Sequence, residues 1–303
     1  MKTISIFDIG RPLTSVVALG YFDGMHLGHQ AVLGRTVMEA DKLDCLPCAF
    51  TFNMWQARPA SKTAGDIMKP RDRNAAMRSH GARVTVTADF AEVMSMSGEE
   101  FVREDLVKWA AGGGICCGTD FRFGAGRSCG AKELEELCAR HNLKLFLVDP
   151  VMYEGLPISS TRIKDELGRG NMEAVNSMLG RAYSHRLVVV RERQLATKLG
   201  FPTINQRYPD SLACPRFGVY HTRATIDGKE YASVSNIGRR PTVEGGDVRT
   251  VLETHVLDYT GNLYRRPIEV ALLHFIRDER RFDSIEELRD AIAADVMKVR
   301  ALT

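Results

Sequence analysis

The run Gly20-Tyr21-Phe22-Asp23-Gly24-Met25-His26-Leu27-Gly28-His29 directly follows four apolar residues, 16–19, that are typical of a buried strand. His26 and His29 stand three residues apart where a helix is expected to begin, so both side chains should lie on one side of its first turn. That turn also offers unpaired backbone N–H groups and the positive end of the helix dipole. The run therefore predicts a phosphate-binding turn between a strand and a helix. It contains no Ser–His or Cys–His pair, so it does not predict a protein nucleophile.

The length and composition of the chain limit the classes of protein to consider. With 303 residues it exceeds the usual size of one hydrophobic core, so two domains are expected. A net charge of +3 gives no indication of nucleic-acid binding, although it agrees with anionic ligands. The first residues lack the apolar core of a signal peptide, and no run reaches the roughly 18 apolar residues of a membrane-spanning helix. We therefore expect a cytoplasmic protein without a membrane partner.

The seven cysteines give no metal or disulfide pattern. Cys45 and Cys48 have CxxC spacing, but they sit in an apolar run that ends as an expected strand, and no second pair supplies further zinc ligands. We predict that the cysteines are small core residues in a reducing compartment.

Residues 14 to about 150 alternate between short apolar runs and helical patterns. A helix is expected over residues 97–111, opened by a capping box of Ser97 and Glu100, and another over residues 131–141. This alternation predicts a Rossmann-like α/β domain whose parallel sheet is covered on both faces, and ligands bind such sheets beyond the carboxyl ends of the strands. The expected strands are residues 16–19, 46–52, 83–87, 115–118 and 143–148.

The pattern changes after Tyr183. From residue 186 to about 275, short β-rich runs alternate with turn signals such as Asp227-Gly228, which predicts an antiparallel sheet or a small β-barrel. Two short helical segments span residues 162–179 before it. A C-terminal helix follows it, with a capping box of Ser284 and Glu287 and a predicted buried stripe of Ile285, Leu288, Ile292 and Val296. We therefore expect domains at residues 1–182 and 183–303.

A second candidate phosphate-binding segment, Ile158-Ser159-Ser160-Thr161-Arg162-Ile163, opens a helical pattern near the end of the first domain. Hydroxyl side chains at a helix start usually just cap the helix. Two hydroxyls with an arginine also suit a triphosphate. The occurrence of this segment in the same α/β domain as the two histidines favours the triphosphate.

Together these motifs resemble the adenylyltransferase module of single-chain bacterial FAD synthetases. The resemblance rests on G-x-F-D-G-x-H-x-G-H at residues 20–29, on I-S-S-T-R at residues 158–162, and on residues 117–124, which are similar to that family's G-x-D/N-F-R-F-G loop. It covers essentially the whole chain. It implies attack by the FMN phosphate on the α-phosphate of ATP, with release of pyrophosphate and no covalent intermediate.

The resemblance also implies roles for individual residues. His26 and His29 would donate hydrogen bonds to the α-phosphate, and Mg²⁺ would bridge the β- and γ-phosphates. Phe52, Asp120 and Phe121 would lie beside the flavin, although an aromatic residue after a strand more often belongs to the core. The other nucleotide-site residues would be Gly20, Phe22, Asp23, Gly24, Gly28, Ser159, Ser160, Thr161 and Arg162. For Asp23 a second interpretation stays open, because an aspartate there could simply order the loop.

One segment departs from that family. Residues 51–56 read Thr-Phe-Asn-Met-Trp-Gln where members commonly carry T-F-x-P-H-P. The histidine and the prolines of the flavin-side loop are therefore missing.

The second half of the chain resembles riboflavin kinases. Residues 199–205 read L-G-F-P-T-I-N against that family's L-G-F-P-T-A-N, and residues 218–220, 235–242, 252–255 and 277–284 hold further similar segments. By this resemblance Glu253 would be the general base on the ribityl hydroxyl of riboflavin. Thr203 and Asn205 would bind Mg²⁺ and, with Gly200 and Pro202, the ATP phosphates. Asn236 and Arg277 would bind the flavin.

This half also departs from its family, because an ungapped comparison puts Leu187, Glu192 and Ala196 at three usual glycine positions. Glycine allows close backbone approach to phosphate, and Glu192 adds a negative charge near a triphosphate. Three functions therefore stay open. The first choice is a bifunctional enzyme that makes FMN from riboflavin and then FAD from FMN. The alternatives are an FMN adenylyltransferase with a degenerate kinase domain and a non-catalytic flavin-binding regulatory protein. A homo-oligomer is compatible with each.

Overall fold

The computed structural model describes residues 3–5, 14–53, 65–191, 199–241 and 248–303, and the chain divides into two compact units, Met1–Ser160 and Thr161–Thr303. The first unit holds a six-stranded parallel sheet with the strand order β1-β4-β3-β2-β5-β6. This arrangement confirms the predicted α/β class. The strands are β1 (Thr3–Ser5), β2 (Ser15–Leu19), β3 (Leu46–Asn53), β4 (Val84–Asp89), β5 (Gly114–Gly118) and β6 (Lys144–Val148).

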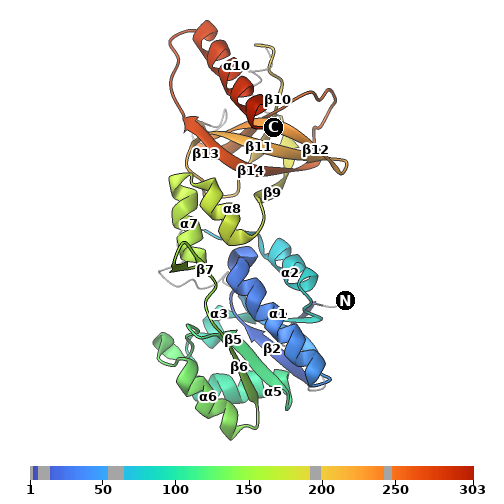
Figure 1. The fold of residues 1–303 in the computed structure, drawn as a ribbon, viewed down its shortest axis with the longest axis vertical. Helices are drawn as coiled ribbons and strands as arrows, with labels where there is room; N and C mark the ends of the chain where they lie inside the picture. Colours follow the sequence, from blue (N-terminus) through green and yellow to red (C-terminus); the bar gives the residue numbers. More distant parts are fainter. Residues whose placement is uncertain (1–2, 6–13, 54–64, 192–198, 242–247) are drawn as a thin grey trace. The chain divides into compact units, whose positions relative to one another are not determined.

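Helices cover both faces of this sheet, and in Figure 1 α1 runs alongside β2 while α6 lies beside β6. The helical segments are η2 (Asp23–Met25), α1 (Leu27–Lys42), α2 (Pro70–Ser79), α3 (Phe90–Val93), α4 (Gly98–Glu100), η4 (Phe101–Leu106), α5 (Val107–Ala110), η5 (Ala125–Arg127) and α6 (Ala131–Arg140). A short hairpin of β7 (Met152–Tyr153) and β8 (Leu156–Pro157) follows.

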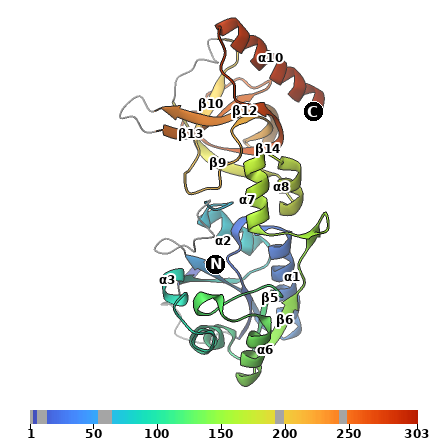
Figure 2. The ribbon, with the colours of Figure 1, turned by 90° about the vertical axis from the view of Figure 1, so that its left-hand side faces the viewer.

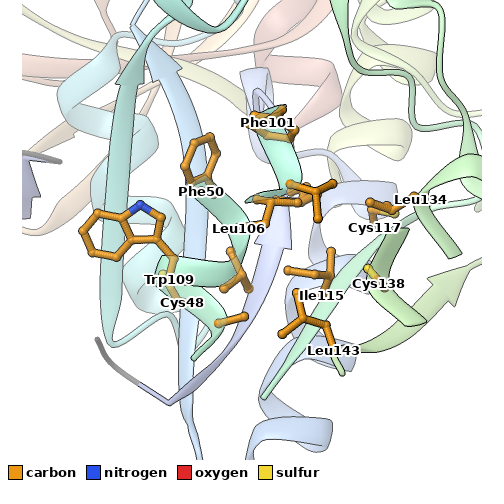
Figure 3. Packing of buried hydrophobic residues seen from close by; sticks show 14 of the residues in the cluster. Cys48, Phe50, Phe101, Leu106, Trp109, Ile115, Cys117, Leu134, Cys138 and Leu143 are labelled. Atoms are coloured by element: carbon orange, nitrogen blue, oxygen red, sulfur yellow. The ribbon is translucent and has the colours of Figure 1, made fainter. Parts of the chain in front are cut away.

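The central strand β2 is buried on both faces, which explains why its sequence is a continuous apolar run. Val16 and Ala18 pack with side chains of α1 and α2 on one face. Val17 and Leu19 point the other way, into a cluster with η4, α5 and α6. Figure 3 shows Leu106, Trp109 and Ile115 meeting in that second cluster from three different elements.

The helix expected over residues 97–111 forms as three segments, because Phe101–Leu106 adopts a π-helix between two short α-helical pieces. Its predicted capping box is confirmed: the Glu100 backbone N–H donates to Ser97 Oγ at 3.2 Å, and the Ser97 N–H donates to Glu100 Oε2 at 2.8 Å.

The second unit is a closed six-stranded antiparallel barrel with the strand order β10-β13-β12-β11-β14-β9, which confirms the predicted barrel. Two helices, α7 (Ser160–Arg169) and α8 (Met172–Leu179), precede it at the expected place. The strands are β9 (Tyr183–Val190), β10 (Thr203–Arg207), β11 (Gly218–Ile226), β12 (Lys229–Pro241), β13 (Val248–Val256) and β14 (Pro267–Asp278). The division into units falls at Ser160, and the functional boundary at residues 182 and 183 stays a prediction.

The C-terminal helix α10 (Ile285–Leu302) lies against the barrel, as Figure 2 shows, and contacts β12. Its N-cap is confirmed, since the Glu287 N–H donates to Ser284 Oγ at 3.0 Å. The predicted buried stripe is wrong at Ile285, which is 58% exposed, because the helix enters the apolar cluster only through later residues such as Val296 and Val299. Leu288 and Ile292 are half-buried and line a cavity.

The cysteines follow the prediction only in part. Cys48, Cys116, Cys117 and Cys138 are buried in the first unit, and burial raises the pKa of the Cys48 thiol to about 12. Cys214 is exposed, so the predicted core role is wrong there. Among the described residues, no helix has the length and apolar character needed to span a membrane.

Candidate nucleotide and flavin sites

The turn that joins β2 to α1 has an unusual backbone. Phe22, Gly24 and Met25 all have positive φ values, of 56°, 79° and 44°. At Gly24 an added Cβ would lie 2.9 Å from the side chain of Ile67, so both the conformation and the space require glycine. The chain therefore makes a tight loop directly before the first turn of α1, at the carboxyl end of a central strand, where ligands bind in open α/β sheets.

The two histidines are brought together at the start of α1. His26 is the N-cap residue: its Nδ1 accepts the backbone N–H of His29 at 3.3 Å, and the two rings stack with centroids 3.6 Å apart. Because Nδ1 accepts in this bond, the neutral ring carries its proton on Nε2, which is then a donor. The ring of Phe22 meets His29 edge-on at 5.3 Å. Gly28 gives His26 room, since a Cβ there would lie 3.2 Å from its ring.

The second candidate phosphate-binding segment meets this turn. Ser160 Oγ donates to the backbone oxygen of Asp23 at 3.0 Å, although the two residues are 137 positions apart in the chain. Ser159 immediately precedes it, and Thr161 and Arg162 follow within the first turn of α7, which the division assigns to the second unit. The Asp23 carboxylate accepts the backbone N–H of Ile67 at 2.7 Å. This bond gives Asp23 the loop-ordering role that the sequence left open.

Beside this turn lies a cluster of Tyr21, Asp66 and Arg73 that the sequence analysis did not predict. The Tyr21 hydroxyl donates to Asp66 at 3.0 Å, and burial together with the Asp66 carboxylate raises the pKa of Tyr21 to about 12. Arg73 of α2 lies over the Tyr21 ring at 4.4 Å and donates to the backbone oxygen of Phe52 at 3.0 Å. This arginine ties the end of β3 to the phosphate-binding turn.

The predicted flavin-side residues lie at the ends of the strands on either side of β2. Phe52 closes β3 and packs edge-on against Phe50 and Phe90, with ring centroids 5.6 and 5.8 Å away. Phe121 follows β5 and stacks on Phe123 at 5.9 Å, and Asp120 beside it is exposed. Both rings are half-buried at the edge of the core, so a packing role is established for them and flavin contact stays a prediction. Met54, Trp55 and Gln56 lie outside the described residues.

In the second unit, the predicted kinase residues form one row across the barrel. The register pairs Asn205 of β10 with Glu253 of β13, Glu253 with Asn236 of β12, Asn236 with Val219 of β11, and Val219 with Arg277 of β14. Directly opposed residues in antiparallel strands present their side chains on the same face. Four residues that the sequence scatters over more than seventy positions therefore gather on one face of the barrel.

Val219, Asn236, Glu253 and Arg277 of this row line a cavity of about 260 Å³. Its walls are apolar at Phe201, Val219, Val234, Phe282, Leu288 and Ile292, with polar residues Thr203, Asn236, Arg240, Glu253, His255, Arg277, Glu279, Arg280 and Asp295. In small-molecule sites, apolar side chains bury the surface of the ligand and polar groups on the wall fix its orientation. The sequence reading assigned roles to Thr203, Asn236, Glu253 and Arg277 and missed the others, whose partners are distant in the chain.

Ion pairs and hydrogen bonds orient the polar groups of this cavity. Arg240 Nη2 lies 3.3 Å from Glu253 Oε2. The side-chain amide of Asn236 donates to Glu279 Oε1 at 2.9 Å. Arg277 forms a two-pronged ion pair with Asp295 of α10, with a shortest N–O distance of 2.7 Å. Glu253, the base proposed from the sequence, therefore lies beside the positively charged Arg240.

The donor set at Thr203 and Asn205 fits Mg²⁺. Asn205 is 2% exposed, and its Oδ1 has no hydrogen-bond partner in the described part of the chain. Thr203 stands two residues away on the same face of β10 and lines the cavity. A buried amide oxygen without a donor and a nearby hydroxyl are hard oxygen ligands of the kind that Mg²⁺ takes.

The segment before β10 is fixed against the barrel. His255 Nδ1 donates to the Pro202 backbone oxygen at 2.8 Å, and its ring meets Phe201 edge-on. Gly200 has a φ of 90°, which favours glycine at the turn. Pro202 and Thr203 line a second cavity of about 350 Å³, together with residues 259–264. Thr203 therefore borders both cavities.

Comparison with known proteins gives matches over both halves of the chain. A family model described as FAD synthetase matches residues 10–162, and a model described as riboflavin kinase matches residues 179–303. A bifunctional riboflavin kinase/FMN adenylyltransferase of Pseudomonas fluorescens is 34% identical over 290 residues, which is 95% of this chain and 92% of that protein. The protein of the same name from Escherichia coli K12 is 30% identical, over 94% and 91% of the two chains.

A solved structure has the same fold. The crystal structure of a protein from Streptococcus pneumoniae described as a macrolide-efflux protein superposes with a TM-score of 0.86, at 29% identity and over 98% of each chain. Motifs, fold and relatives agree in both units. The chain therefore belongs to the family of bifunctional riboflavin kinase/FMN adenylyltransferases.

Proposed function

We propose that this protein makes FAD from riboflavin in two ATP-dependent steps, the first in the barrel unit and the second in the α/β unit. The barrel would transfer the γ-phosphoryl group of ATP to the terminal ribityl hydroxyl and release ADP. The α/β unit would join the FMN phosphate to the α-phosphate of ATP and release pyrophosphate. A cytoplasmic location and a homo-oligomeric state stay predictions.

In the kinase step, Glu253 would accept the hydroxyl proton while the hydroxyl oxygen attacks the γ-phosphate. The Arg240 guanidinium, 3.3 Å from the Glu253 carboxylate, would hold the base in place. Asn236 and Arg277 line the same cavity and would bind the flavin ring. Thr203 and Asn205 would hold Mg²⁺, which neutralises phosphate charge when bound.

In the adenylyl-transfer step, no group on the protein needs to become covalently attached. His26 and His29 would donate to the α-phosphate as negative charge develops on it. The backbone N–H groups at the start of α1 would add further donors. Ser159, Ser160, Thr161 and Arg162 would hold the β- and γ-phosphates. Catalysis would come from position and charge neutralisation.

The adenylyl-transfer half depends above all on the hydrogen bond from Ser160 Oγ to the Asp23 backbone oxygen. Two segments that would each bind phosphate are adjacent because of it, and a nucleotide needs both ends of its phosphate chain held. Without this adjacency, a helix cap would explain the hydroxyls equally well.

Incubation with riboflavin, ATP and Mg²⁺, followed by chromatography of the flavins, tests the proposal. We expect FMN as an intermediate and FAD as the product. Formation of FAD only when FMN is supplied would instead support an adenylyltransferase with a degenerate barrel. No conversion of either flavin would support a non-catalytic flavin-binding protein.

One of the three altered glycine positions has a packing role in the barrel. Leu187, at a usual glycine position, lies in β9 with 5% exposure and packs with Tyr208 and Leu212. Its side chain is therefore part of the hydrophobic core. Glu192 and Ala196, the other two altered positions, lie outside the described residues.

A further inference from the structure

The Arg277 guanidinium has a fixed orientation in the flavin cavity. Its Nε lies 3.1 Å from both carboxylate oxygens of Asp295, its Nη2 lies 2.7 Å from Asp295 Oδ2, and its Nη1 donates to the Asp278 backbone oxygen at 3.0 Å. All three nitrogens are engaged, so the plane of the group cannot turn without breaking several bonds. A bidentate arginine–carboxylate pair supplies this geometric specificity.

Asp295 interrupts an apolar stripe of α10. Leu288, Ile292 and Asp295 share one face of the helix at helical spacing, and all three line the cavity. The Asp295 side chain is 4% exposed. Burying a carboxylate costs free energy that an ion pair often fails to recover, and an apolar residue of similar size at such a place commonly gives equal or greater stability. Stability alone therefore gives no reason for an aspartate here.

A second pair on the same helix provides the comparison. Arg300 of α10 forms a two-pronged ion pair with Asp258, at 2.7 and 3.1 Å, but both side chains are largely exposed, at 49% and 70%. That pair joins α10 to the end of β13 without lining the cavity. The two pairs share geometry and differ in burial and place, so a role in the cavity is specific to Asp295.

We propose that Asp295 is a positioning residue for the flavin: it holds the guanidinium of Arg277 in the orientation that binds the flavin ring. The inference rests on the proposed flavin site in this cavity. Without the carboxylate, Arg277 would keep only its bond to the Asp278 backbone oxygen and its position beside the Phe282 ring, whose centroid is 5.8 Å away. The guanidinium could then leave the cavity wall.

Riboflavin binding without ATP tests this role, measured by the quenching of riboflavin fluorescence on titration with the full-length protein. We expect Asp295→Asn to weaken riboflavin binding by about tenfold or more, as the loss of a charge-assisted bidentate contact predicts. Asp258→Asn is the matched control and should leave the riboflavin affinity unchanged. In steady-state kinetics, the KM for riboflavin should rise in Asp295→Asn, while the KM for ATP and the adenylylation of supplied FMN stay as in the wild type.

Two further variants separate positioning from general support of the fold. Asp295→Glu, which keeps a carboxylate, should recover part of the affinity. Arg277→Lys loses the planar fork, so it should weaken binding as Asp295→Asn does, and the double variant should bind no more weakly than either single one. If Asp295→Asn does not fold, the riboflavin affinities of Arg277→Lys and Asp295→Glu test the role instead. Arg277→Lys should bind riboflavin more weakly than the wild type, and Asp295→Glu should bind it more tightly than Arg277→Lys.

Equal riboflavin affinity in Asp295→Asn and the wild type would overturn the inference, as would an equal loss in Asp258→Asn or additive effects in the double variant. The proposed kinase activity can fail separately: a wild type that binds riboflavin without phosphorylating it would contradict that activity and still allow the binding comparison. A wild type that binds no riboflavin would overturn the positioning role together with the flavin site.

Discussion

At the scale of single residues, His26 and His29 fix one another. The N-cap hydrogen bond and the stacked rings orient the two imidazoles, and the donor nitrogen of His26 is set by the bond that its other nitrogen accepts. Preorganised donors of this kind stabilise the transition state because they need no rearrangement when charge develops.

We expect His29→Ala to lower the rate of FAD formation from FMN by about 100-fold or more, the usual effect of removing one such donor. Formation of FMN from riboflavin should continue at the wild-type rate, because the kinase residues lie in the other unit. His80→Ala, at an exposed histidine at the end of α2, is the control. Loss of both activities in His29→Ala would contradict separate sites.

Glu253→Gln keeps the shape of the side chain and removes the base. Riboflavin phosphorylation should fall by about 100-fold or more, in the range typical of general base catalysis, while supplied FMN is still converted to FAD. Glu230→Gln, an exposed glutamate of β12 paired with Arg223, should leave both rates unchanged. An unaltered phosphorylation rate in Glu253→Gln would show that another group accepts the proton.

The residues that sequence analysis found differ in kind from those it missed. His26, Ser160 and Glu253 stand in short motifs, so their chemistry could be predicted locally. The Ser160 bond brings the two candidate phosphate-binding segments together in the first unit, and the strand register pairs Glu253 with Asn205 in the second. Arg73 and Asp295 act through partners far away in the chain. In a sequence each looks like one more charged residue on a helix, and only folding reveals its burial.

At the scale of elements, the β2–α1 turn depends on the backbone at Gly24. Gly24→Ala should lower the free energy of unfolding by about 1–3 kcal/mol, because a non-glycine residue at this positive φ is strained and its Cβ would meet Ile67 at 2.9 Å. Gly34→Ala is the matched control within α1: no atom lies within 4 Å of its added Cβ, so the helix should gain about 0.5–1 kcal/mol. Denaturant unfolding measures the change in the free energy of unfolding of each variant. A destabilised Gly34→Ala together with an unaffected Gly24→Ala would contradict the argument.

How well a helix or strand could be predicted from the sequence depends on how much of it is buried. Strands β2, β3 and β5 were expected because a strand covered on both faces requires a continuous apolar run. The edge strand β6 is partly exposed and was expected from its own short apolar run. Helix α2 was missed since its sequence, PRDRNAAMRS, has no apolar stripe and its buried residues are Arg73 and Met77. The edge strand β1 has three residues, too few for a periodic pattern. The π-helical turn at Phe101–Leu106 was not expected either, and three of its residues are buried in the core cluster.

At the scale of the whole molecule, each unit has its own core, its own candidate site and its own family match. We therefore expect an equimolar mixture of His29→Ala and Glu253→Gln to form FAD from riboflavin, because the first variant would release FMN that the second then adenylylates. Chromatography of the flavins against each variant alone measures the effect. Accumulation of FMN with no FAD would mean that the adenylylating unit cannot use FMN from solution.

Glu253 has its chemical neighbours only in the completed barrel. Asn205 and Asn236 stand opposite it on the two neighbouring strands, and Arg277 lies further along the same row. A slip of one residue in any pairing would turn a member of the row to the opposite face. During refolding from denaturant, phosphorylation of riboflavin consequently cannot return before the last strand pairs. The time at which riboflavin kinase activity returns therefore reports when the barrel closes. This event is distinct from the earlier return of secondary structure.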